Sequence, residues 1–277
     1  MKKNERAAAI VRTIVVSLIA VLFVVPLVWM VLSSLKTAPE VFARPFHWLP
    51  ARVQWQNYAT VWMNEEASML RAFANTLYIA LFSIIGQMFI SSLAAYSFAK
   101  INFKGKQVVF MLFLSSMMVP SQLTIIPRFM LFKTIGLYNN LWAIILPAFF
   151  GATSIFMLRQ FYMGLPNDLI EAAKIDGAGH LRIFLRIMLP LTKAALMSLI
   201  ILAFIGSWNE YMAPLIFLVK KELYTVSQNI QWYMLDEFKE HNLTMAAATS
   251  AIVPVVILFI VGQKYFVEGI ATSGVKG

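Results

Sequence analysis

Long apolar runs constrain this chain more than any other feature of its sequence. Six stretches are apolar enough to cross a hydrocarbon core about 30 Å thick, which takes roughly 20 residues of helix. They cover residues 13–34, 76–99, 107–126, 141–158, 194–219 and 243–263. The fifth run is interrupted by Glu210, and the fourth is short unless it begins a few residues earlier. The sequence therefore predicts an all-α membrane protein with six transmembrane helices in a single domain over residues 1–277.

Composition agrees with a membrane environment, because 60% of the 277 residues are hydrophobic and only 13% are charged. A membrane barrel is excluded because it would show many short segments of alternating polarity. The first run is longer than the apolar part of a secretory signal, about 7 to 15 residues, and is predicted to be retained. Prolines within the runs are expected to act as kinks, which membrane helices tolerate. They are Pro26, Pro120, Pro147 and Pro254.

The positive charge is unevenly divided between the two sets of segments that connect the spans. Most of the 23 Lys and Arg residues lie in the set that includes both termini. Cytoplasmic loops carry the excess of Lys and Arg in membrane proteins. Both termini are therefore predicted to be cytoplasmic. The net charge of +10 is a topology signal, and no nucleic-acid partner is expected because no basic face with interleaved aromatics lies outside the spans.

The connection between the fourth and fifth runs, residues 164–193, is longer than a helix connection needs. Asp168 is predicted to cap a short helix, with Glu171 three positions later completing a capping box. Gly177 and Gly179 are expected to supply the positive φ that ends this helix and reverses the chain. From the physics alone, a re-entrant or interfacial helix pair that lies on the membrane is the alternative reading of this segment.

A second helix is predicted over 181–189, and the whole segment resembles the EAA motif of ATP-binding-cassette (ABC) importer permeases. The spacing from the glutamate to the glycine and on to a Leu-Pro pair is similar, although Ala194 stands where many members have proline. The residues that carry the resemblance are Glu171, Ala172, Ala173, Asp176, Gly177, Ala178, Phe184, Ile187, Leu189 and Pro190. The resemblance implies a cytoplasmic coupling helix that docks on an ATPase. Its coupling residues would be Glu171, Ala172, Ala173, Asp176, Gly177, Ala178 and Gly179.

The resemblance extends over nearly the whole chain and is strongest to maltose-type carbohydrate permeases, in particular the MalG-like subunit. It rests on Trp48, Asn57, Tyr58, Asn75, Trp208, Asn209, the run Tyr265 to Gly269, and Val275, Lys276 and Gly277. It implies a multi-pass protein of the bacterial or archaeal cytoplasmic membrane. The implied partners are a homologous MalF-like permease, a MalK-like ATPase dimer that binds ATP and Mg²⁺, and an extracytoplasmic solute-binding protein.

The motifs that the sequence lacks agree with a transport subunit that is not an enzyme. It contains no GxxxxGK[ST] loop to cradle nucleotide phosphates, so ATP hydrolysis is expected on a partner chain. It has no cysteine and no catalytic or metal-binding constellation, so no catalytic residue, metal or bound cofactor is predicted. An independent secondary transporter or channel remains the main alternative, although such folds usually show internal repeats or several intramembrane charges. A membrane-embedded enzyme is the third reading.

Polar and aromatic residues within the spans are the candidates for a solute pathway. They are Gln87, Gln122, Trp208, Asn209, Glu210 and Tyr211. Taken singly, each polar residue is more readily explained by hydrogen bonds between helices. Glu210 is the strongest candidate, because a carboxylate in lipid costs about 2.5 kcal/mol or more. It is expected to face water, to meet a cation or to lie at the outer interface. The expected solute is a sugar, an oligosaccharide or a glycerol phosphate, with the choice left open.

Overall fold

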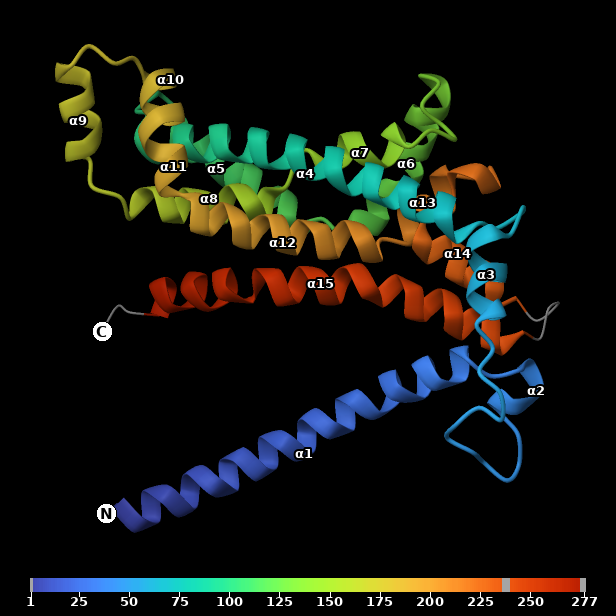
Figure 1. Ribbon diagram of the computed structural model, residues 1–277. Coiled ribbons are helices and arrows are strands. Elements are labelled where there is room, and N and C mark those ends of the chain that lie inside the picture. Colours follow the sequence, from blue (N-terminus) through green and yellow to red (C-terminus); the bar gives the residue numbers. More distant parts are fainter. Residues whose placement is uncertain (1, 236–239, 275–277) are drawn as a thin grey trace. The chain divides into compact units, whose positions relative to one another are not determined.

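The computed structural model describes residues 2–235 and 240–274, with side chains given for 5, 8–235 and 240–263. The described residues form helices and connecting segments without a strand (Figure 1). Contacts divide the chain into two compact units, Met1–Leu70 with Asn229–Val253 and Arg71–Gln228 with Pro254–Gly277. Tyr265 to Gly269 contribute to the resemblance noted above, but their side chains are not among those described. Val275, Lys276 and Gly277 lie outside the described residues. The expected single domain stays a prediction.

Four helical stretches are long and apolar enough to cross a membrane, and they coincide with the first, second, fourth and sixth apolar runs. The first lies in α1 (Lys2–Ser34), and the second is α4 (Met69–Lys100). The third combines α7 (Trp142–Ala148) with α8 (Ala152–Met163), and the fourth begins α15 (His241–Gly274). They measure 27, 32, 22 and 23 residues.

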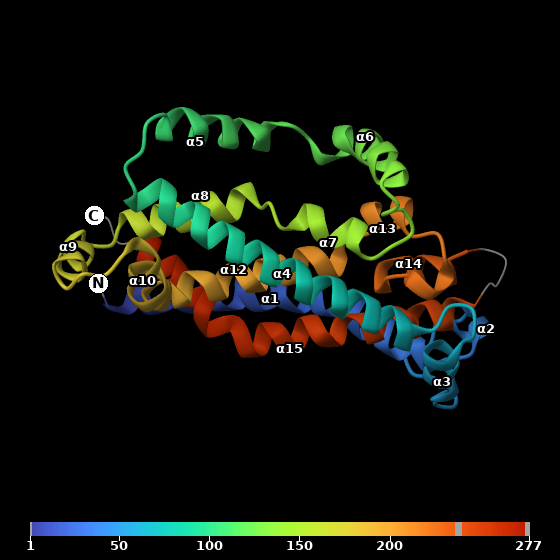
Figure 2. The same cartoon turned by 90° about the horizontal axis from the view of Figure 1, so that it is seen from above.

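The third apolar run does not form one helix. α5 (Lys106–Ser115) continues as the 3-10 turn η1 (Ser116–Met118), and the chain then bends by 96° into α6 (Ser121–Thr134). Figure 2 shows α5 and α6 as two separate helices. Val119 is extended, with φ −85° and ψ 113°, because a following proline disfavours the helical conformation. The predicted helix over 107–126 with only a kink at Pro120 is therefore wrong.

The fifth apolar run is also interrupted. α12 (Lys193–Asn209) ends before Glu210, which is extended with ψ 125°, and α13 (Met212–Phe217) follows. A helix continued through Glu210 would press the ring of Pro214 against the Glu210 carbonyl four residues earlier. The prediction of a single helix over 194–219 is wrong for this reason.

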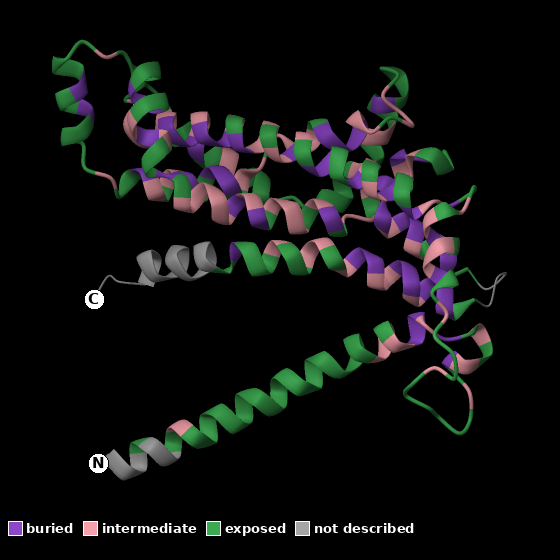
Figure 3. Ribbon diagram, in the orientation of Figure 1, coloured by how far each residue is buried: buried purple, intermediate pink, exposed green. Residues whose placement is uncertain are grey.

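Buried amides hold the first unit together where α1 ends. This unit also contains α2 (Ala38–Val41), α3 (Gln56–Met63) and the start of α15. Asn57 Nδ2 donates to the carbonyls of Ser34 and Lys36 at 2.8 Å, and Asn242 Nδ2 donates to Asn57 Oδ1 at 3.0 Å. The apolar part of α1 is exposed along nearly its whole length (Figure 3), as expected for a surface covered by lipid or by another membrane chain.

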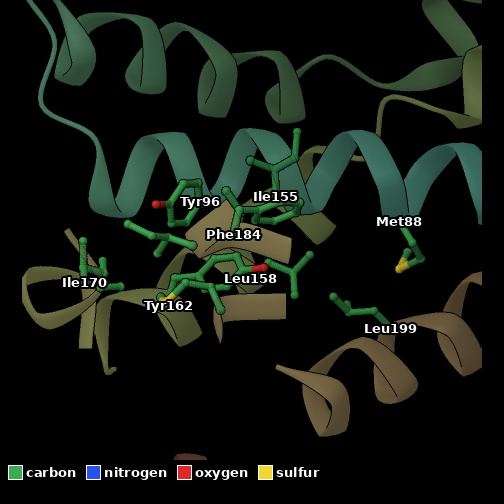
Figure 4. Close-up of a cluster of buried hydrophobic side chains, with 12 residues drawn as sticks. Met88, Tyr96, Ile155, Leu158, Tyr162, Ile170, Phe184 and Leu199 are labelled. Atoms are coloured by element: carbon green, nitrogen blue, oxygen red, sulfur yellow. The ribbon is translucent and has the colours of Figure 1, made fainter. Parts of the chain in front are cut away.

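The second unit packs around two clusters of buried apolar side chains. One joins α4 and α8 to the segment that follows α8 and to α12, and Figure 4 shows Tyr96, Leu158 and Phe184 within it. The other joins α4, α6, α7 and α13 around Phe217. The 3-10 turn η3 (Lys221–Leu223) and α14 (Val226–Tyr233) follow α13 in the chain. Helix packing therefore places the segment after α8 beside the end of α4.

Candidate functional site

The segment that resembles the EAA motif begins with the short helix α9 (Asp168–Ile175), which lies beyond the end of α8 (Figure 1). Its N-cap is Asn167, whose carbonyl accepts the N–H groups of Ile170 and Glu171 at 2.8 and 3.1 Å. No side chain makes a cap hydrogen bond here. The predicted cap at Asp168 and the capping box with Glu171 are therefore wrong, because Asp168 already lies inside the first turn.

A tight reversal ends α9. The N–H of Gly177 donates to the Lys174 carbonyl at 3.0 Å, and the N–H of Ala178 donates to the Ala173 carbonyl at 2.9 Å. This pair of bonds is a Schellman motif, which needs a left-handed residue after the cap. Gly177 supplies it with φ +76°, as predicted. Gly179 has φ −73° and ψ 163°, so its predicted positive φ is wrong.

α9 has one buried face and one exposed face. Ile170 and Ala173 are 5% and 7% exposed and belong to the first core cluster, where Figure 4 shows Ile170 close to Tyr162. On the other face Ile175 is 87% exposed. Among the expected coupling residues, Ala173 is buried and Ala178 half-buried. The exposed ones are Glu171, Ala172, Asp176, Gly177 and Gly179.

The second helix of the segment is longer than predicted and changes its winding. α10 (His180–Ile183) runs into the π-helical turn η2 (Phe184–Met188) and then α11 (Leu189–Leu191). The predicted helix over 181–189 lies within these elements. Phe184 and Met188 are both buried in the first core cluster. A bend of 76° separates this helix from α12. The part of the segment that follows α9 in the chain is therefore packed into the core of the second unit.

Sequence reasoning missed the side chains of α4 that reach this segment. Lys100 Nζ donates to the Leu165 carbonyl at 2.7 Å and to Asn167 Oδ1 at 2.6 Å. The Tyr96 hydroxyl lies 3.1 Å from His180 Nδ1. Lys100 was visible in the sequence only as one of the positive charges that predict topology. The signal available in the sequence was a lysine at the C-terminus of a long helix, where a positive charge interacts favourably with the helix dipole.

The predicted pathway residues do not form one cluster. Gln87 lies within α4 and donates to Ser154 Oγ of α8 at 3.1 Å, which is a bond between helices. Gln122 is exposed in the first turn of α6, and its Oε1 accepts the Ser121 hydroxyl at 3.4 Å. Asn209 is exposed at the end of α12 and donates to the Ile205 carbonyl at 2.9 Å. Each of the three side chains therefore has a partner within the chain, and Gln122 and Asn209 are exposed as well.

The remaining candidates lie at the break between α12 and α13. Trp208 is only 2% exposed and packs against Phe73 and Phe204, with ring centroids 5.3 and 5.4 Å away. Glu210 and Tyr211 are half-buried. Because its ring faces contact protein, Trp208 packs the helix here and is not an open platform for a sugar ring.

The described residues thus form a helical membrane protein with a short, partly exposed helix, α9, between the fourth and fifth apolar runs. Residues 87–272 match the family described as the binding-protein-dependent transport system inner membrane component. This chain belongs to that family of ABC importer permeases.

Relatives and a solved structure agree with this assignment. The chain is 33% identical to the arabinooligosaccharides transport system permease protein AraQ of Bacillus subtilis, over 96% of this chain and 95% of AraQ. It is 29% identical to the sn-glycerol-3-phosphate transport system permease protein UgpE of Pectobacterium atrosepticum, over 94% of each chain. It also resembles a chain of a bacterial ABC transporter that imports the acidic polysaccharide alginate. That match has a TM-score of 0.84 at 23% identity and covers 95% of this chain and 98% of the other, so it shows the shared fold.

Proposed function

We propose that this permease forms half of the translocation pathway of a carbohydrate importer and couples transport to ATP hydrolysis by a separate subunit. The observation that carries the proposal is that α9 has one face packed on the core and one face exposed. It is held to the second unit by Ile170 and Ala173, while Ala172 and Ile175 stay open on its other side. An exposed apolar side chain on a rigid, capped helix is suited to a groove on a partner protein.

The proposed assembly contains a second, homologous permease, an ATPase dimer and an extracytoplasmic solute-binding protein. ATP and Mg²⁺ would bind to the ATPase, because this sequence has no phosphate-binding loop. The chain would cross the membrane six times if each bent helix pair is one broken span. Both termini and α9 would then lie in the cytoplasm, in agreement with the distribution of Lys and Arg.

Carbohydrate is the proposed solute class. The chain is similar to AraQ over almost the whole length of that protein, and AraQ is named for the transport of arabinooligosaccharides. UgpE is the reason to include a glycerol phosphate. A pathway open to such solutes needs polar groups that face water, and the exposed Gln122 and Asn209 are available for that role.

Co-purification and reconstitution test this function. The tagged chain should bring down an ATPase and a second membrane subunit. A cysteine at Ala172, which is exposed, should crosslink to the ATPase, and one at the buried Ala173 should not. The complete complex in vesicles is then tested for ATP-dependent uptake of an arabino-oligosaccharide, maltose and sn-glycerol 3-phosphate. Purification as a single component with ATP-independent transport would refute the proposal and favour a secondary transporter.

A further inference from the structure

The C-terminal end of α4 contacts the chain on both sides of α9. Before α9, Lys100 Nζ donates to the Leu165 carbonyl at 2.7 Å and to Asn167 Oδ1 at 2.6 Å. Asn167 is also the residue whose carbonyl begins the α9 hydrogen-bond ladder. A single ammonium group thus joins the last residue of α4 to the entry and to the N-cap of α9.

After α9, the contact is made by Tyr96, one helical turn earlier on α4. Its hydroxyl lies 3.1 Å from Nδ1 of His180, the first residue of α10. Tyr96 is only 3% exposed, and the centroid of its ring lies 5.4 Å from that of Phe184 and 6.1 Å from that of Tyr162. Residues four apart lie on the same face of a helix, so Tyr96 and Lys100 reach the segment together.

The end of α4 is itself braced by two further cations. Lys106 Nζ, at the start of α5, donates to the carbonyls of Ala99 and Ile101 at 3.4 and 3.0 Å. Arg159 Nε of α8 donates to the Phe98 carbonyl at 3.3 Å. These bonds satisfy carbonyl groups that a helix end would otherwise leave without partners. The anchor for α9 is therefore a fixed point where α4, α5 and α8 meet.

We propose that Lys100 is a positioning residue that, with Tyr96, clamps α9 to α4, so that a displacement of α9 is transmitted first to α4. The inference rests on the proposed function of α9 as the contact with the ATPase. The apolar contacts of Ile170 and Ala173 alone are non-directional. Hydrogen bonds from an ammonium group are directional and stronger than neutral ones, so they fix where α9 begins.

The first test compares two lysines that carry the same charge and lie close together in the sequence. Lys100→Met keeps the length of the side chain and removes its donor group. Lys104→Met removes the same charge from an exposed side chain that makes no hydrogen bond within the described part of the chain. In vesicles holding the complete complex, we expect Lys100→Met to lower the amount of solute moved per ATP hydrolysed by about fivefold or more. Lys104→Met should keep the wild-type ratio, and Lys100→Arg should restore it. The solute is whichever of the arabino-oligosaccharide, maltose or sn-glycerol 3-phosphate the wild-type complex imports.

Hydrogen exchange on the same complexes needs no solute and reports the clamp directly. Lys100→Met should raise amide exchange in α9 and leave α4 and α8 protected. Asn167→Ala removes the acceptor on the other side of the contact and makes a second variant should Lys100→Met fail to insert. Because Asn167 makes no side-chain cap bond, its loss should act through Lys100. The double variant should then be no worse than Lys100→Met, whereas Asn167→Ala alone should be milder because Lys100 keeps its bond to the Leu165 carbonyl.

Two outcomes separate this inference from the proposed function. If the ATPase co-purifies but Lys100→Met and Asn167→Ala keep both the wild-type ratio and the wild-type exchange of α9, the clamp is wrong and the permease role stands. The clamp is also wrong if Lys104→Met lowers the ratio as much as Lys100→Met, since charge alone would explain both. If the wild-type chain brings down no ATPase, the proposed function itself fails.

Discussion

The Glu210 carboxylate accepts a hydrogen bond from the Ala213 N–H at 2.9 Å and so caps the first turn of α13. The residue therefore has a structural contact as well as a charge. Glu210→Gln keeps an acceptor oxygen and removes only the charge. We expect this variant to insert and assemble normally but to transport solute more slowly.

Glu210→Ala removes the cap as well and should cost about 1 kcal/mol more in stability than Glu210→Gln. Initial uptake rates in vesicles and thermal unfolding of the purified complex separate the two effects. Transport kinetics identical to wild type in Glu210→Gln would show that the carboxylate only caps the helix.

Gly177 is predicted to be essential for coupling because its φ of +76° suits few other residues. Gly177→Val places a β-branched side chain in this conformation at a cost of at least about 1 kcal/mol, without touching an apolar span. We expect the variant to accumulate normally and to lose solute-dependent ATP hydrolysis. Gly177→Asn is the matched control, since asparagine tolerates a left-handed backbone. Normal transport by Gly177→Val would contradict the coupling role of the turn.

The close approach of α4 to the break between α7 and α8 gives a stability prediction. A Cβ added to Gly86 would overlap the ring of Phe149. Gly86→Ala should therefore lower the thermal midpoint, with a cost of about 1 to 3 kcal/mol for overpacking. Gly206→Ala is the control, because an added Cβ there meets no atom within 4 Å and alanine favours a helix. Equal midpoints for the two variants would mean that this contact is loose.

The buried hydroxyl of Tyr233 leads us to expect a loss of stability at high pH. Burial, with a smaller effect of the charge of Glu240, raises the pKa of Tyr233 from 10.0 to about 12. The neutral phenol is the form that donates to the Ala67 carbonyl at 3.0 Å. Its contribution to stability is complete below pH 10 and is lost as the pH rises from about 10 to about 12. Thermal unfolding of the wild type and Tyr233→Phe measures this, and the variant should lack that part of the pH dependence.

The topology prediction uses the absence of native cysteine. Thr60 and Gly105 are both exposed, and in the chain Thr60 precedes the second apolar span and Gly105 follows it. A cysteine at Thr60 should react in intact cells with a thiol reagent that cannot cross the membrane. A cysteine at Gly105 should react only after the membrane is opened. Labelling of Gly105 in sealed cells would reverse the assignment of the termini.

The sequence by itself determined the properties that depend on local composition and backbone preference. Long runs of apolar residues require a membrane. The excess of Lys and Arg in alternate connecting segments predicts which of these segments lie on the cytoplasmic side. The end of α9 at Gly177 was also predictable, because few other residues favour a positive φ. Pro120 and Glu210 marked the two interrupted runs, but a proline or a charge in a sequence does not say whether a helix kinks or ends.

Only the tertiary structure decided which side chains meet. Lys100 and Asn167 are separated by 67 positions, and their contact depends on how α4 and α8 pack. Packing of α9 on the first core cluster turned Ala173 inward, and packing of α12 against α4 brought Phe73 to the Trp208 ring. Contacts of this kind depend on the distance and direction between helices. Those quantities come from the packing of the whole second unit, whereas a periodic pattern in one segment fixes only which of its own residues share a face.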